Sequence, residues 1–295
     1  MKALILALAA LLAQWPHYKQ ADAPRLPDGK VNLTAPAPKF FDGHPDLSGV
    51  WENPGWREGA AAGGSVSGTG GAPGSRTEET QRPQRPLLAA FFELGSMVPG
   101  GLPYQPWAKA LKDQRTKDNA KDNPDAHCLP LGNMQLHLHP EPRKIIQGKN
   151  EIVILYEGNE GIREIFTDGR PLPKLSEAEP AWLGYSVGRW EGDVFVVESI
   201  GFRDHGWLSA NQAWPNSDAL HTTERWRRVD FGHLEEIVTI DDPKAYLKPW
   251  TNKIILTYQA DTELLDSYCD NQGIMQAHYS MGPRPEEPAS PPLTK

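Results

Sequence analysis

The feature that most constrains the fold of this chain is a succession of short β-rich segments over residues 143–269. Residues 151–156, Glu-Ile-Val-Ile-Leu-Tyr, are typical of them, because β-branched and aromatic residues predominate and glycines flank the segment. Short turns join neighbouring segments and almost no helical pattern separates them, which favours antiparallel pairing. We expect strands at 151–156, 161–167, 182–190, 194–200, 220–229, 234–240, 253–259 and 263–269.

A further strand is expected to open at Gly49-Val50-Trp51. Eight or nine strands of this kind can close into a barrel, which removes the exposed edges of the sheet. The sequence therefore predicts an all-β fold, an antiparallel barrel formed by a single domain over residues 24–282. A two-sheet β-sandwich is the alternative.

Outside the strands the chain is expected to be largely irregular, since it contains 28 Pro and 27 Gly. Residues 14–47 are expected to form an extended arm, and 283–295 a disordered Pro-rich tail. Residues 59–86 are mainly Gly, Ala, Ser, Thr, Pro and Arg, which bury too little apolar surface to become ordered, so a flexible loop is expected there. One short helix is expected at 106–120, where Pro106 suits the first turn.

The N-terminus has the pattern of an export signal. Lys2 precedes an apolar run over residues 3–13, which is shorter than the roughly 20 residues that span a bilayer as a helix. We therefore expect residues 1–23 to be a signal peptide and leader, and the protein to be periplasmic or secreted with no transmembrane segment. An exported protein with two cysteines is expected to pair them, so Cys128 and Cys269 are predicted to form a disulfide.

Charge and motif content exclude several classes of function. The net charge of −8 argues against a nucleic-acid partner, because binding to phosphates is driven by an excess of Lys and Arg. The chain has no P-loop, no dinucleotide fingerprint and no Gly-x-Ser-x-Gly elbow. No cofactor is therefore expected, and the oligomeric state is left open.

Several motifs carry a resemblance to known proteins. Residues 45–51, Pro-Asp-Leu-Ser-Gly-Val-Trp, resemble the Gly-x-Trp opening strand of lipocalin-type barrels. Five further motifs are similar to those of a family of exported bacterial proteins of unassigned function, over about residues 24–275. The resemblance implies a lipocalin-like (calycin-type) β-barrel in a bacterial envelope or secreted setting, and it implies no activity. These motifs are Cys128-Leu129-Pro130, residues 165–171, 188–193 and 217–221, and residues 239–246.

A barrel of this size can enclose one small ligand, and the chain has ten Trp, a residue of cores and binding pockets alike. Arg163 shares a strand face with Ile165 and Thr167, so it is a candidate to point inward and bind a carboxylate or phenolate. A surface position for this arginine is the alternative. The expected ligand-binding residues are Arg163, Trp182, Tyr185, Trp207 and Trp226.

The candidate acid–base residues are His221, Glu224 and Asp204. A histidine can exchange a proton near neutral pH, and a carboxylate can orient it. However, residues 221 and 224 are three apart on an expected strand and so face opposite sides of the sheet. Trp226 shares the face of Glu224, which favours Glu224 as the inward residue. A charged outer surface of the sheet is the alternative interpretation.

His137-Leu138-His139 is the clearest metal-like feature. On a strand, residues two apart project to one face and both imidazoles could reach one ion. Pro140 and Pro142 indicate a loop instead, and a closed ligand set is missing from the sequence, so no metal is predicted. The candidates for a third ligand are His221, Glu141 and Asp204.

The sequence thus predicts an exported binding protein for a small, largely apolar or aromatic molecule held in the barrel. The alternative is a cofactor-independent hydrolase, lyase or isomerase that uses His, Asp and Glu in the same cavity. A third possibility is an envelope assembly protein with no enclosed pocket.

Overall fold

The computed structural model describes residues 19–53, 94–177, 179–209 and 212–265. The core of the expected signal peptide, the Gly-rich segment 59–86 and the tail 283–295 lie outside these residues. So does Cys269, the predicted partner of Cys128.

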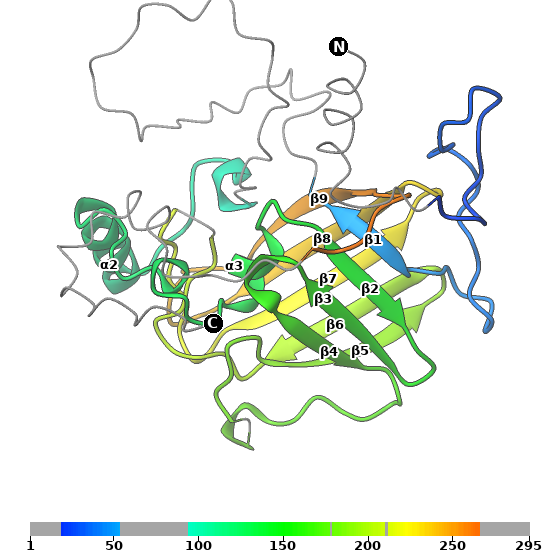
Figure 1. The fold of residues 1–295 in the computed structure, drawn as a ribbon. Helices are drawn as coiled ribbons and strands as arrows, with labels where there is room; N and C mark the ends of the chain where they lie inside the picture. The colour runs from blue at the N-terminus through cyan, green and yellow to red at the C-terminus, as the bar shows by residue number, and fades with distance from the viewer. Residues whose placement is uncertain (1–18, 54–93, 178, 210–211, 266–295) are drawn as a thin grey trace, which may run out of the picture.

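The described chain folds into a closed barrel of nine strands (Figure 1). Each strand pairs with the next in the sequence, and the last pairs with the first to close the ring. This confirms the all-β barrel and disposes of the two-sheet alternative. The strands are β1 (Gly49–Glu52), β2 (Arg143–Gln147), β3 (Glu151–Tyr156), β4 (Ile162–Phe166), β5 (Tyr185–Glu191), β6 (Val194–Ile200), β7 (His221–Arg228), β8 (His233–Asp241) and β9 (Trp250–Tyr258).

The expectation of purely antiparallel pairing is wrong at one position, because β4 and β5 are parallel. Residues 167–184 join these strands, and parallel strands need a crossover of about a dozen residues or more. Strands β5 and β6, by contrast, are joined by a tight turn in which Gly192 has φ +62°. A strand was also expected at 263–269, but residues 263–265 are irregular and the remainder lies outside the described residues.

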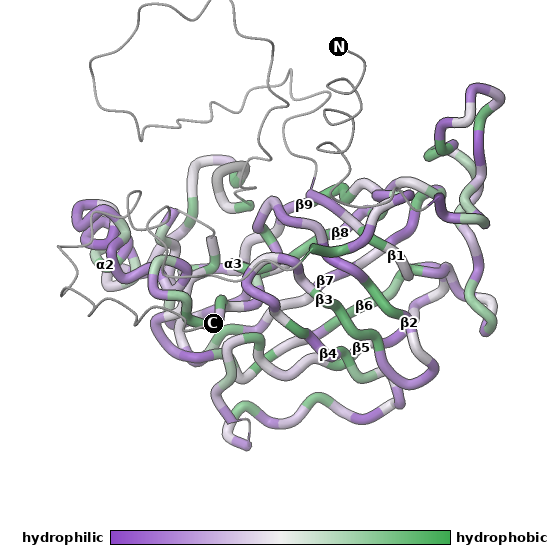
Figure 2. Tube along the Cα trace, in the orientation of Figure 1, coloured by the Kyte–Doolittle hydropathy of each residue, from purple (hydrophilic) through white to green (hydrophobic). Residues whose placement is uncertain are grey.

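The expected helix at 106–120 is present and ends three residues early. Asn119 and Ala120 both take left-handed conformations, with φ near +57° and +55°, which ends the helix. Helix α2 is hydrophilic along most of its length in Figure 2 and lies outside the barrel wall. The helical elements are η1 (Leu94–Met97), α2 (Pro106–Lys117), η2 (Pro124–His127), α3 (Asn133–His137), η3 (Gly158–Glu160) and η4 (Leu175–Glu177).

The strands alternate between buried and exposed positions, as a sheet with one face turned to the barrel interior requires. The interior contains large aromatic side chains that are completely buried: Trp51, Phe195 and Trp226. These rings pack among aliphatic residues from β2, β3, β4, β6, β8 and β9, so burial of apolar surface is the main source of stability.

The two ends of the barrel are covered by different segments (Figure 1). The N-terminal arm lies at one end, where the backbone amides of Phe231 and Gly232 donate to the carbonyls of Ala35 and Leu33. Helices α2 and α3 lie at the opposite end. None of the helices in the described part of the chain is long and apolar enough to cross a membrane.

Candidate ligand site inside the barrel

A layer of charged side chains lies within the barrel interior, close to α3. It comprises Arg143 on β2, Arg163 on β4, Glu224 on β7 and Glu236 on β8. None of the four is more than 2% exposed. Strand alternation places them there, because each occupies an inward position of its strand; Glu236, for example, lies between the buried Leu234 and Val238.

Arg163 and Glu224 satisfy each other. The guanidinium donates two hydrogen bonds to the carboxylate, of 2.6 Å from Nη2 and 3.0 Å from Nη1. It also donates to the hydroxyls of Ser186 and Ser199, which are cross-strand neighbours on β5 and β6. Burial alone would lower the pKa of Arg163, but the charge and hydrogen bonds of Glu224 more than offset it and raise the pKa. This pair is a fully formed buried ion pair.

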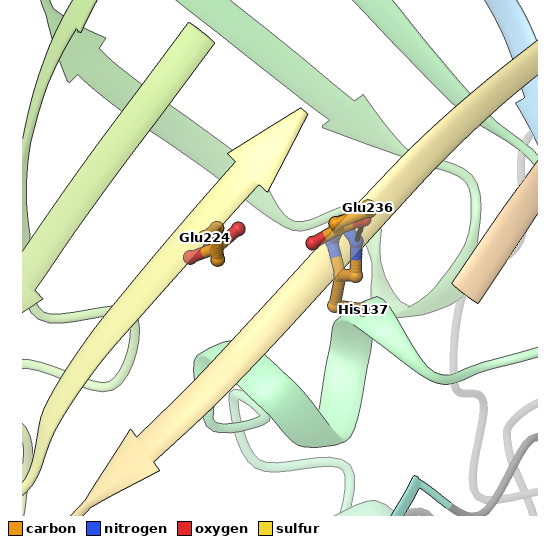
Figure 3. A group of neighbouring side chains, drawn as sticks. All are labelled: His137, Glu224 and Glu236. Carbon is orange, nitrogen blue, oxygen red and sulfur yellow. Dashed lines mark hydrogen bonds and ion pairs between the residues drawn. The ribbon is translucent and has the colours of Figure 1, made fainter. Parts of the chain in front are cut away.

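Glu236 contacts a histidine from outside the sheet. Helix α3 carries His137 into the barrel, where Nε2 lies 2.7 Å from Oε2 of Glu236 (Figure 3). Its Nδ1 lies 2.9 Å from the hydroxyl of Tyr156. Burial lowers the pKa of His137 well below its usual value, and the charge of Arg143 adds to this effect. Burial also raises the pKa of Glu236, which the two arginines oppose. Both shifts favour the uncharged imidazole of His137 and the protonated carboxyl of Glu236, with a single proton between Nε2 and Oε2.

The carboxylates of Glu224 and Glu236 face each other across a short gap (Figure 3). With Nε2 of His137, one oxygen from each lies within 4.8 Å of the others. The two buried carboxylates repel each other at this distance, and the positive charges of Arg143 and Arg163 in the same layer oppose the rise in the pKa of Glu236. A nitrogen and two carboxylate oxygens also form a set of donors that a metal ion could use.

Arg143 differs from Arg163 because it has no such partner. All three of its guanidinium nitrogens are buried, and none hydrogen-bonds to any described residue. Its closest aromatic neighbour is Tyr156, whose ring centre lies 5.7 Å from the guanidinium carbon. Burial lowers the pKa of Arg143, and the charges of Tyr156, Glu236 and Glu224 counteract this. A buried guanidinium with three unsatisfied nitrogens is a strong recognition group for an anion.

A small pocket lies at the α3 end of the barrel. Trp182, Trp207 and Asn133 are among the residues that line it, and its volume of about 10 Å³ accommodates about one water molecule. Both side-chain polar atoms of Asn133 are buried without a hydrogen-bond partner among the described residues. This pocket alone is too small for an organic ligand.

The predicted ligand-binding residues are separated in the structure. Arg163 and Trp226 face the barrel interior, so the surface position that was the alternative for Arg163 is wrong. Trp182 and Trp207 lie at the end of the barrel. Tyr185 begins β5 beside the inward Ser186, and its hydroxyl accepts a hydrogen bond from Arg170 on the outside.

The predicted acid–base residues are not brought together. Glu224 lies inside the barrel, whereas His221 faces outward with Nε2 3.6 Å from the carboxylate of Glu198. Asp204 lies in an exposed loop, where it contacts His205. The opposite orientations of residues 221 and 224 agree with the spacing argument from the sequence.

His137 and His139 diverge because His137 is the last residue of a short helix and His139 follows that helix, so neither lies on a strand. Nδ1 of His139 is 3.3 Å from Glu141, and its Nε2 is 3.8 Å from Asp125. The pair therefore cannot act as two ligands from one strand face, although His137 has acidic neighbours on other strands.

Three important residues of the site were missed from the sequence: Arg143 and Glu236 of the charged layer, and Tyr156, which contacts His137. The signal was present, since each alternates with buried apolar residues, as Arg143 does with Ile145. A charged residue at an inward strand position is the pattern that could have identified Arg143 and Glu236.

Fold and site together define a closed nine-stranded barrel with a buried charged layer. Comparisons with known protein families, with curated proteins and with solved structures found no match. The resemblance to exported bacterial proteins therefore stays a prediction.

Proposed function

We propose that this protein binds a small, largely aromatic or apolar molecule inside the barrel and holds a negatively charged group of that molecule at Arg143. The single observation that carries the proposal is the completely buried guanidinium of Arg143, none of whose nitrogens hydrogen-bonds to a described residue. Burying a polar group without a partner costs about 1–3 kcal/mol, and more when it is charged. A bound anion offsets this cost.

The chemistry of the surroundings selects the ligand. A planar guanidinium donates two parallel hydrogen bonds to a carboxylate, and the same fork suits a phenolate. Arg143 is the cross-strand neighbour of Trp51 on β1 and of Tyr156 on β3. Aromatic groups on both sides suit the apolar body of the ligand, and Arg163 is already engaged by Glu224.

The ligand is proposed to enter at the end of the barrel that α3 covers. This helix has five residues and contributes His137 to the charged layer. The interior contains large buried side chains, so binding requires α3 to move away from the strands.

The first test is native mass spectrometry of the full protein, purified from the exported fraction of its own host. We expect a co-purifying small acid that is lost from Arg143→Gln and retained by Lys144→Gln. Lys144 is the matched control, because it lies next to Arg143 on β2 and is exposed on the outer face. A protein free of any small molecule, or equal retention by Arg143→Gln, contradicts the proposal.

An enzyme is the second candidate function, favoured by the 2.7 Å contact between His137 and Glu236. These residues replace His221 and Asp204 as the proposed acid–base pair. A hydrolase, lyase or isomerase of this kind would retain binding of the co-purified acid in Glu236→Gln and lose turnover of it. A pure binding protein would leave the acid unchanged with either side chain at position 236.

Export and the disulfide belong to the same proposal. The apolar run after Lys2 supports a periplasmic or secreted location, where Cys128 would pair with Cys269. Intact mass measured with and without reductant tests the disulfide, and the mature N-terminus read from the same sample tests the signal peptide. A thiol-reactive reagent that labels both cysteines without reduction would contradict the pairing.

A further inference from the structure

We propose that His137, Glu224 and Glu236 bind one divalent transition-metal ion, such as Zn²⁺ or Mn²⁺. This site goes beyond the proposed binding of an organic acid and does not depend on it. Figure 3 shows the three side chains converging from α3, β7 and β8.

The donor set and its geometry carry the proposal. One imidazole nitrogen and two carboxylate oxygens lie within 4.8 Å of one another, and all three residues are at most 1% exposed. Metal bonds of about 2.0–2.2 Å place neighbouring ligand atoms about 3.0–3.5 Å apart. The 2.7 Å between His137 and Glu236 would therefore open by a few tenths of an ångström, and Glu224 would move closer.

Two of the three donors are held in orientation by outer partners, as metal ligands commonly are. The hydroxyl of Tyr156 contacts Nδ1 of His137 at 2.9 Å. In the tautomer whose Nδ1–H donates to this hydroxyl, the lone pair of Nε2 faces Glu236. Arg163 holds Glu224 through both of its oxygens, each of which keeps a lone pair for a metal ion.

An independent observation comes from Glu236 itself. Its Oε1 is buried and receives no hydrogen bond of standard geometry from any described residue, although the neighbouring Trp226 and Glu224 side chains help to lower the pKa of this carboxyl. A buried carboxylate oxygen without a donor, beside a second buried carboxylate, calls for a cation or a proton. A metal ion between the two carboxylates would provide this oxygen with a partner.

The net charge of the layer indicates that a bound metal ion would also need an anion. Two positive charges from the metal and two from Arg143 and Arg163 exceed the two negative charges of the glutamates by two. Burying that excess is costly, so an anion is expected as the remaining metal ligand. Arg143 can donate hydrogen bonds to this anion, because its guanidinium nitrogens have no partner among the described residues. Hydroxide or acetate from solution would serve in the absence of an organic acid.

The test is metal binding by the full protein after chelator treatment and dialysis, with Zn²⁺ or Mn²⁺ as the only added ligand. Calorimetry and elemental analysis are expected to give one ion per chain. The affinity should fall at least tenfold in His137→Ala and in Glu236→Gln. It should stay unchanged in His139→Gln and His221→Gln, which remove nearby histidines outside the site.

Crystals of the unmodified protein soaked in Zn²⁺ give a readout that needs no variant. An anomalous peak between the three side chains supports the site even if His137→Ala fails to fold. No stoichiometric ion, a peak elsewhere, or undiminished binding by Glu236→Gln overturns it, and a shared proton then accounts for the paired carboxylates. Because no organic acid is added, failure here leaves the role of Arg143 intact, and loss of acid binding leaves the metal site intact.

Discussion

Inside the barrel, the two arginines of the charged layer are equally buried but differ in what surrounds them. Arg163 makes a bidentate ion pair with Glu224 and contacts two serines, whereas Arg143 has aromatic neighbours and no hydrogen-bond partner among the described residues. A buried ion pair adds little net stability, because the cost of desolvating both charges offsets their attraction. Removing one partner is nevertheless strongly destabilising, because the other charge is left buried and uncompensated. The surroundings of Arg163 therefore suit a structural role, and those of Arg143 suit the proposed recognition of an anion.

Replacing Arg163 by Met should lower the free energy of unfolding by about 3–5 kcal/mol, because Glu224 is left buried without its cation. The double variant Arg163→Met/Glu224→Leu should recover most of this loss, since both charges are then gone. Urea unfolding followed by tryptophan fluorescence measures each value. Losses that simply add in the double variant would show that the two side chains do not interact as the distances indicate.

Among the elements, the N-terminal arm is attached to the barrel through a small set of polar contacts. Arg25 makes an ion pair of 2.6 Å with Asp261, which follows β9, and the backbone amide of Gln20 donates to the same carboxylate. The hydrogen bond from Arg25 lowers the pKa of Asp261 below its usual value of 3.8. The arm is thus attached most firmly while Asp261 is ionised.

The contribution of this contact should be present above about pH 3.8 and be lost as the pH falls through the lowered pKa of Asp261. The sign follows because the unfolded chain binds the proton more readily than the folded one. Hydrogen exchange of residues 20–33, corrected for intrinsic rates, should rise in that acid range. Asp261→Asn should show fast exchange already at neutral pH and little further change; an arm equally protected in both proteins would contradict the assignment.

At the scale of the whole molecule, the barrel has two weakly paired seams, which are the contacts of β1 with β9 and of β4 with β5. Strands β1 and β9 are paired through two residue pairs, as are β4 and β5, while β7–β8 and β8–β9 each have eight. Few hydrogen bonds across a seam mean that it can open without unfolding the remainder. All nine strands thus form one closed sheet, in which the strands from β5 to β9 are paired more extensively than those from β1 to β4.

Native-state amide exchange should be slowest in β7 and β8 and clearly faster in β1 and β4. The expected order follows from the pairing, because strands with eight paired neighbours on a side need larger openings to exchange. Exchange from β1 at the same rate as from β8 would show that the seams open only with global unfolding.

Much of the fold is determined locally and was predictable. The alternation along β7 places Glu224 and Trp226 on one face and His221 on the other, and the observed burial follows that order. The parallel contact of β4 with β5 was missed, because the strand pattern does not say which edge of β4 the chain returns to after residues 167–184. Helix α3 was missed because five residues are too few for a helical period to appear.

By itself, the sequence predicted most of the strand segments and which residues share a face within each strand, since backbone geometry ties side-chain direction to position along a strand. It left open which face of each strand points inward, and so whether Arg163 lies inside the barrel or on its surface. Only the tertiary structure decided which inward residues meet. His137, Tyr156 and Glu236 come from separate elements, and their contact depends on barrel closure and on where α3 packs. The charges of that layer are set by neighbours far apart in the chain, because burial and electrostatic interaction depend on distance in space.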